Sequence, residues 1–426
     1  MDSKEFEKLV SLGLGRAVLQ LLERPTEPFR EVILDACLNN KAYDAQIEGS
    51  RAEYMMDLMR LTGDLPFYAD AVLEGLKKEA EDWDTWQRFR IARLLAQEGS
   101  QRAREGMREV FSSSPESMIS SFAEEFIELD GIEGLLYVVD RRAEQLRQNS
   151  EKWEDDYFLS VAADKCGKEV TEVALKDAAG KNQNVRAYLR AVEENRVKRE
   201  KRKQPRSGKL TYDEIRSLIE NGKDANSLVK WSQTATEPEL QRAARDLAQA
   251  TDPRKLKRYL LLFRKRRFPL EYEPLFRLLE LPDGPVPRHA LVVLANLEDE
   301  KVRGLAFNLV ESKSSLRGYA IDLLVKNFRD GDHAVIEGWC DAEENPPDIN
   351  AYDRSLREFF VAHPNPATEL RLLTKLYEKE PCAHCRCHIV DRLLKLGGLT
   401  ETLRRECEHD SYKETRKLVM AQATPN

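Results

Sequence analysis

Apolar residues recur along most of the chain with the i, i+3, i+4, i+7 spacing of an amphipathic helix. The spacing is complete at residues 69–76 and 132–139. No alternating run of β-branched residues is long enough to predict a strand. Turn and cap residues, such as those at 62–64 and 112–115, divide the chain into helices of about 10–18 residues. We therefore predict an all-α protein, built as a bundle or as stacked helical hairpins.

The second half of the chain favours stacked hairpins. Arg288, Arg303 and Arg317 are each followed by a small residue and then by a helical apolar stripe, about one helix and one turn apart. Residues 298–306, EDEKVRGLA, combine an acidic cap, a Val-Arg pair and a small residue. This segment resembles the start of a HEAT-type repeat, most clearly over residues 235–330. The resemblance implies an α-solenoid, in which each hairpin buries one face against its neighbours.

The first half carries a weaker likeness. Residues 42–54 and 127–136, together with residues 381–386 near the end, are similar to uncharacterised bacterial HEAT-repeat proteins. That likeness implies a shape for the chain and no chemistry.

Charge divides the 426 residues into three parts, although the net charge is only −7. Residues 1–195 hold 26 Lys+Arg and 39 Asp+Glu, whereas residues 196–270 hold 21 and 9. Within 196–209, eight of fourteen residues are basic and only Val197 is a sizeable apolar residue, so this stretch cannot bury a face. It predicts a solvated helix end that runs into a flexible linker. We predict an acidic helical block at 1–195, a basic linker at 196–210 and a HEAT-like block at 211–426.

Two helix boundaries are marked clearly in the second block. Thr211 and Glu214 have the spacing of a capping box, which predicts a helix that starts directly after the linker. The sequence Asn-Pro-Pro-Asp at 345–348 predicts a break between helices.

The basic residues around 254–267 are a candidate nucleic-acid surface. They flank an apolar core at 260–263, and phosphates would neutralise a positive stripe there. Tyr259, Phe268 and Trp231 could supply stacking surfaces. The interpretation that we favour is that the same charges pair with the acidic N-terminal half or with a protein. The predicted contact residues are Lys257, Arg258, Arg264, Lys265, Arg266, Arg267 and Trp231.

Seven cysteines and no secretory signal favour a reducing cytosol over a disulfide scaffold. Cys382 and Cys385 have the C-x2-C spacing of a zinc site, and Cys407 and His409 could complete it. However, Cys385 shares a helical apolar face with Ile389, and the C-x-H spacing is unusually short. We therefore favour packed thiols, keep zinc as the alternative and predict no cofactor.

Two further clusters have structural interpretations. Trp83, Asp84, Trp86 and Arg90 form an aromatic and charged patch, which we interpret as a partly buried contact between repeats. Asp44, Glu48, Arg51 and Glu53 combine carboxylates with an arginine. We interpret them as helix caps and ion pairs.

The sequence contains no phosphate-binding loop, dinucleotide fingerprint, metalloprotease helix or nucleophile elbow, so we predict no catalytic residue. No apolar stretch is long enough to predict a membrane span. We predict a cytoplasmic, non-enzymatic scaffold that binds a protein partner along a solenoid surface. The alternative is a nucleic-acid binder resembling the HEAT-like DNA glycosylases. Those enzymes use a positive concave face with Trp, Asp and Arg, for which Trp231, Trp339 and Asp341 are candidates here.

Overall fold

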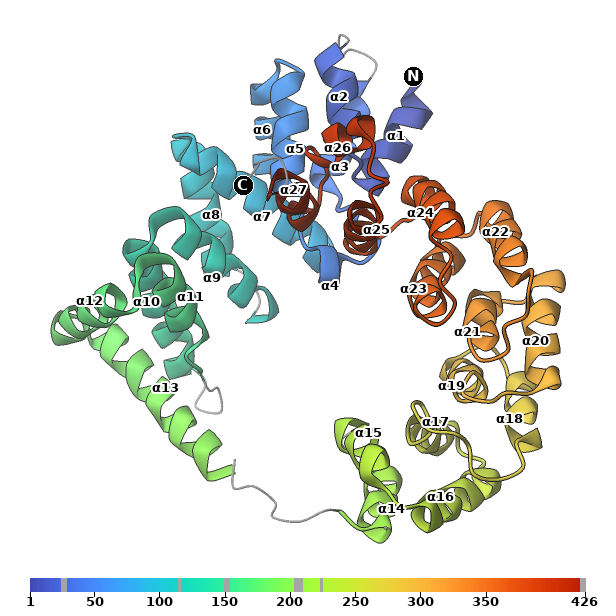
Figure 1. Cartoon of the computed structure of the whole chain (residues 1–426). Helices are drawn as coiled ribbons and strands as arrows, with labels where there is room; N and C mark the ends of the chain where they lie inside the picture. Colours follow the sequence, from blue (N-terminus) through green and yellow to red (C-terminus); the bar gives the residue numbers. More distant parts are fainter. Residues whose placement is uncertain (24–28, 114–115, 149–153, 203–209, 223–224, 422–426) are drawn as a thin grey trace. The chain divides into compact units, whose positions relative to one another are not determined.

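The structure of the chain is a computed structural model, which describes residues 1–23, 29–113, 116–148, 154–202, 210–222 and 225–421. Every regular element in these ranges is a helix, so the predicted all-α class is confirmed. The chain divides into two compact units (Figure 1). Unit 1 comprises residues 1–206 and 400–426, and unit 2 comprises residues 207–399.

Unit 1 contains helices from both ends of the chain. Its helices are α1 (Ser3–Leu12), α2 (Arg16–Glu23), α3 (Arg30–Leu38), α4 (Ala45–Glu48), α5 (Ala52–Leu61), α6 (Leu65–Gly75), α7 (Asp82–Gln97), α8 (Gln101–Ser113), α9 (Glu116–Asp130), α10 (Ile132–Gln148), α11 (Tyr157–Cys166), α12 (Lys168–Lys181), α13 (Gln183–Arg202), α26 (Glu401–Cys407) and α27 (Lys413–Ala421). Helices close in sequence pack together, as α7 does with α8 and α9 (Figure 1).

Unit 2 is formed by one continuous segment of the chain. Its helices are α14 (Tyr212–Glu220), α15 (Ala225–Thr234), α16 (Glu237–Gln249), α17 (Pro253–Leu261), α18 (Glu273–Arg277), η2 (Leu278–Glu280), α19 (Pro285–Leu294), α20 (Glu300–Glu311), η3 (Arg317–Tyr319), α21 (Ala320–Leu324), α22 (Asp332–Ala342), α23 (Pro346–Ala362), α24 (Pro366–Lys379) and α25 (Ala383–Lys395). Both predicted boundaries are confirmed. Thr211 and Glu214 form a capping box, and α23 begins at Pro346 within the expected break.

The apolar stripes found in the sequence form the cores of the units. In unit 1, Phe89 of α7 stacks on Phe122 of α9 with ring centroids 4.0 Å apart, and both side chains are fully buried. In unit 2, Ile321, Leu323 and Leu324 of α21 are likewise buried. Burial of this kind stabilises each helix mainly through its neighbours rather than through its own propensity.

Along unit 2, side chains at regular intervals donate hydrogen bonds to backbone carbonyl groups of a turn about 30 residues earlier. Asn296 donates to the carbonyl of Arg264 at 3.2 Å, and Asn327, which follows 31 residues later, donates to that of Leu297 at 3.0 Å. Arg266, 30 residues before Asn296, donates to the carbonyl of Gln233 at 3.4 Å. These bonds satisfy backbone acceptors at corresponding places about one hairpin apart.

The arginines of the HEAT-like pattern link successive elements. Arg303 of α20 forms a two-pronged ion pair with Asp332 at the start of α22, at 2.6 and 2.7 Å. Arg317 of η3 binds Glu343 at 2.7 Å and Asp348 at 2.8 Å. Parallel bonds of this kind define the geometry as well as add energy.

The C-terminal helices belong to unit 1, in contrast to the predicted block at 211–426. The amide of Ser411 donates to the carbonyl of Gly13 at 2.9 Å, and Arg16 pairs with Glu406 at 2.8 Å. No local pattern in the sequence reveals a contact between residues about 400 positions apart. Residues 196–202 complete helix α13, in agreement with the helix end predicted at the start of the basic stretch, and residues 203–209 lie outside the described residues.

Candidate functional site

The predicted phosphate contacts lie on α17 and on the turn that follows it, in unit 2. Four of these cations are exposed and form no ion pair with any described residue. We call these four the basic surface: Lys257, Arg264, Lys265 and Arg267. Within unit 2, no acidic side chain of the described residues forms an ion pair with these four cations.

Arg258 and Arg266 have structural roles. Arg258 donates to the carbonyl of Gly222 at 2.5 Å, which ties α17 to the end of α14. Arg266 donates to the backbone of Gln233, as described above. Both guanidinium groups therefore already donate hydrogen bonds to backbone carbonyl groups, and we do not include them in the basic surface.

The charges of the basic surface act on His289 of α19. Burial lowers its pKa, and the positive charges of Lys257 and Arg264 lower it further. Lys257 on α17 and Arg264 on the turn after it thus act on the same imidazole. The uncompensated charge at this place favours an anionic ligand.

Trp231 is not available as a stacking surface, contrary to the prediction. Its side chain is only 4% exposed, and its ring packs against Tyr212 with centroids 5.8 Å apart. The apolar face of α15 buries it in the core, as is usual for tryptophan. Tyr259 and Phe268 are buried in the same way. A ligand at the basic surface would therefore bind through charge and not through these rings.

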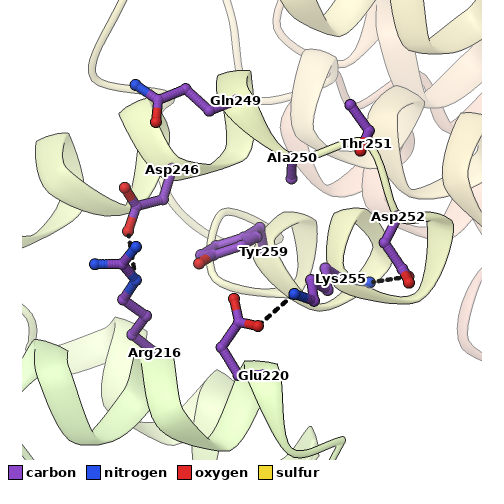
Figure 2. Close-up of a pocket in the computed structure, with 9 residues that line it drawn as sticks. All are labelled: Arg216, Glu220, Asp246, Gln249, Ala250, Thr251, Asp252, Lys255 and Tyr259. Atoms are coloured by element: carbon purple, nitrogen blue, oxygen red, sulfur yellow. Dashed lines mark hydrogen bonds and ion pairs between the residues drawn. The ribbon is translucent and has the colours of Figure 1, made fainter.

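A polar cleft of about 270 Å³ lies next to α17 (Figure 2). Its lining comes from α14, α16 and α17 with the loop between the last two. It consists of Arg216, Glu220, Asp246, Gln249, Ala250, Thr251, Asp252, Lys255 and Tyr259. Figure 2 shows that the charges of the cleft are paired across it: Arg216 with Asp246 at 3.4 Å, and Lys255 with Glu220.

Hydrogen bonds hold the floor of this cleft. The Tyr212 hydroxyl donates to Asp246 at 2.7 Å and also bonds to the Tyr259 hydroxyl. Burial and the nearby Asp246 carboxylate raise the pKa of Tyr212. Asp252 caps α17 by accepting from the amides of Arg254 and Lys255. Because its cations are already neutralised, the cleft is a weaker anion site than the basic surface beside it.

The cysteine and histidine candidates do not form a metal site in the described residues. Within these ranges, no group of three or more His, Cys, Asp or Glu side chains is placed to hold a metal ion. Cys382 and Cys407 are buried, as expected for packed thiols. Cys385 is only partly buried and lies at the first turn of α25.

The tryptophan patch of unit 1 is more exposed than predicted. Trp83 at the start of α7 is 40% exposed and lies edge-on to Trp86, with centroids 5.6 Å apart. The segment before α5 packs beside it, since the Asn40 amide donates to Asp84 at 2.7 Å. That segment presents Tyr43 and Ile47, which are 41% and 51% exposed.

Acidic residues lie directly before Trp83. Glu79, Glu81 and Asp82 are exposed and form no ion pair with any described residue. Together with Tyr43, Ile47 and Trp83 they form what we call the acidic aromatic surface. Exposed aromatic side chains beside unpaired carboxylates favour a ligand that combines apolar and basic groups.

The neighbouring carboxylates have the structural roles predicted for them. Asp44 caps α4, and Glu48 forms a buried ion pair with Arg51 at 2.6 Å. Glu53 accepts from Arg90 at 2.9 Å. These contacts confirm the interpretation as helix caps and ion pairs.

The residues proposed for glycosylase chemistry have other partners in the structure. Asp341 pairs with Lys375 at 2.7 Å, and Trp339 packs edge-on to Phe307 at 5.4 Å. With Trp231 buried as well, these side chains are structural contacts and we assign no catalytic role to them.

Among the described helices, none is both long enough and apolar enough to span a bilayer. No family model matches the sequence, and neither does any curated protein. One similar solved structure is the crystal structure of an engineered protein, with 14% identity over 99% of this chain and 98% of the other. Its TM-score of 0.20 is too low to support any argument about fold or function.

Two features of these sites were missed from the sequence. The carboxylates at 79–82 were visible in the sequence but were not connected to Trp83. The recurring carbonyl-binding side chains, Asn296 and Asn327, could have been found from their spacing of about one hairpin.

Proposed function

We propose that this protein is a non-enzymatic scaffold, built from HEAT-like hairpins, that binds a protein partner through the acidic aromatic surface of unit 1. The supporting observations are the exposure of Trp83 directly after three unpaired carboxylates, and the exposure of Tyr43 and Ile47 on the segment that hydrogen-bonds to Asp84. Aromatic residues that are already rigidly packed lose little entropy on binding and often dominate interface energetics.

The partner chemistry follows from this surface. An apolar anchor would cover Trp83 and Ile47, while lysine or arginine side chains around it would face Glu79, Glu81 and Asp82. Charge complementarity of this kind raises the association rate and selects the partner, and the apolar contact supplies most of the affinity. We therefore expect a protein segment with basic residues around an apolar centre.

Substituting Tyr43, Ile47 and Trp83 together with alanine is expected to abolish capture of this partner. A single hot-spot residue among the three would contribute roughly 2 kcal/mol or more, so the triple variant should bind at least about 30-fold more weakly. The measurement is affinity capture from the cells that make the protein, with quantitative mass spectrometry of the bound proteins.

The matched control substitutes Val170 and Val173 with alanine. These α12 residues belong to the same unit and are 55% and 63% exposed. Proteins that depend on the acidic aromatic surface should be lost from the triple variant and retained by the control. Equal recovery of every protein by both variants would contradict the proposal.

A second function is supported by the basic surface of unit 2. We propose, as the alternative, that Lys257, Arg264, Lys265 and Arg267 bind the phosphates of a nucleic acid. The supporting observation is that these four exposed cations have no ion pair in the described residues. Such binding would be independent of sequence and would weaken steeply with salt.

This alternative predicts a specific salt dependence. Substituting Lys257 and Arg264 with alanine should make the negative slope of log K against log salt less steep by about 1.8 on duplex DNA, since each lost phosphate contact contributes about 0.9 to its magnitude. The measurement is a binding titration by fluorescence anisotropy between about 50 and 200 mM salt. Substituting Lys4 and Lys8, which are exposed on α1, is the control and should leave the slope unchanged. Binding by the wild type that is insensitive to salt would rule this function out.

A further inference from the structure

Two cysteines at the start of α25 lie in an environment that the functions above do not use. Cys382 is the N-cap residue of α25, with an extended backbone at φ −88° and ψ 116°, and Cys385 lies in the first turn. Neither cysteine forms a disulfide in the structure, and the Cys382 side chain hydrogen-bonds to Cys385. Residues three apart at a helix start are close enough for a disulfide.

Helix α23 supplies a cation and an amide to the same place. Arg357 and Asn350, both on α23, form side-chain hydrogen bonds to Cys385. Arg357 also pairs with Asp353, which is 1% exposed. Cys385 therefore has three polar partners and one neighbouring positive charge, in addition to the partial positive charge of the helix start.

A buried carboxyl lies next to this thiol pair. Glu380 is fully buried, and its Oε1 accepts from the amide of Cys382 at 3.0 Å and from Asn350 at 2.7 Å. Its Oε2 has no hydrogen-bond partner within the described part of the chain. A fully buried carboxyl with an unused oxygen is costly for stability alone.

The titration behaviour of these groups agrees with the geometry. The hydrogen bond from Cys382, together with Asn350 and Arg357, lowers the pKa of Cys385 to about 5, although burial opposes this. Burial, followed by the charge of Asp353, raises the pKa of Glu380 to about 8. These shifts favour a thiolate at Cys385, beside the Cys382 thiol, and a protonated carboxyl at Glu380.

We propose that Cys382 and Cys385 form a redox-active dithiol that a low-molecular-weight disulfide oxidises to an intramolecular disulfide. Cys385 is partly exposed and attacks one sulfur of the small disulfide, which forms a mixed disulfide and releases one thiolate. The Cys382 thiol then loses its proton to that thiolate and attacks Cys385 Sγ. The second small thiolate leaves, and the protein has lost two electrons that the small disulfide has gained.

The chain offers a direct assay. Trypsin cleaves after Lys379 and Arg386, so residues 380–386 carry both cysteines of the pair and Cys387 falls on the next peptide. The reduced full-length protein is incubated with oxidised glutathione, quenched in acid, alkylated and digested. We expect the 380–386 peptide to have lost two hydrogens and to carry no alkyl group.

Three variants define the roles of the residues. Cys382→Ser should trap glutathione as a mixed disulfide on Cys385, whereas Cys385→Ser should leave Cys382 unmodified because that thiol is buried. Cys387→Ser is the control and should form the disulfide as the wild type does. The proposal is overturned if the wild-type 380–386 peptide keeps both thiols after the same treatment, or if Cys387 takes up glutathione as fast as Cys385.

Alkylation rates give a readout that does not require the disulfide to form. At pH 6 an ordinary thiol is about 0.3% ionised, whereas Cys385 should be largely ionised. Lower intrinsic nucleophilicity reduces the advantage, which leaves roughly a tenfold faster reaction with iodoacetamide than for Cys166 in the same chain. Arg357→Gln should reduce that ratio, with circular dichroism showing that the variant is folded. Equal rates for Cys385 and Cys166 in the wild type would contradict the proposal.

Discussion

Replacing Arg51 with methionine is expected to lower the free energy of unfolding of unit 1 by about 3–5 kcal/mol. The Arg51 side chain is 2% exposed, pairs with Glu48 at 2.6 Å and donates to the carbonyl of Ser11 at 2.7 Å. Its removal leaves a buried carboxylate without its partner and a backbone acceptor without its donor. The measurement is urea unfolding, with hydrogen exchange of peptides from α5 to assign the transition to unit 1.

The matched control for this prediction is Arg60→Met. Arg60 lies on α5, the helix that Arg51 caps, and pairs with Asp57 at 3.1 Å and with Glu98, but all three side chains are about half exposed. An exposed pair contributes roughly 0–1 kcal/mol, so this variant should unfold near the wild-type midpoint. Equal losses for both variants would show that the burial of Arg51 does not matter.

Replacing Gly15 with alanine is expected to detach the C-terminal helices from unit 1. A Cβ atom at this position would lie 1.9 Å from the carbonyl oxygen of Glu406, and a backbone atom cannot yield as a flexible side chain can. Overpacking costs about 1–3 kcal/mol in a core and more where the backbone must move. We therefore expect hydrogen exchange in α26 and α27 to rise to near the rate of an open segment.

Gly180→Ala provides the comparison. Gly180 lies inside α12 and nothing surrounds a Cβ built there, so the same substitution should be neutral or stabilise by up to about 1 kcal/mol. Unchanged exchange of α26 and α27 in the Gly15 variant would mean that the helices dock in another way.

The positions of helices and of their caps could be predicted from the sequence, because each depends on the residue types within a few neighbouring positions. Apolar spacing at 69–76 and 132–139 falls within α6 and α10, except for Leu76, which caps α6, and the capping box at Thr211 starts α14 as expected. The caps and ion pairs around Arg51 followed from residue types at helix starts. These features need only a few neighbouring residues, so periodicity and capping rules are sufficient.

The remaining features depend on contacts between distant segments. The return of residues 400–426 to unit 1 rests on Gly13, Gly15 and Glu406, whose pairing no local rule contains. Trp231 was predicted to be a stacking surface, but whether its ring is exposed depends on which helix packs over it, and the local sequence does not show this. The same limit applies to Cys385, whose partners Asn350 and Arg357 lie about 30 residues earlier.

The central claim is that the acidic aromatic surface binds a protein partner. A direct measurement of the affinity for that partner tests this claim. The captured partner is purified and titrated calorimetrically into the wild-type chain, the Tyr43/Ile47/Trp83 alanine variant and the Val170/Val173 control. We predict a Kd at least about 30-fold higher for the triple variant and an unchanged Kd for the control. A triple variant that is folded by circular dichroism and binds with the wild-type Kd would contradict the account.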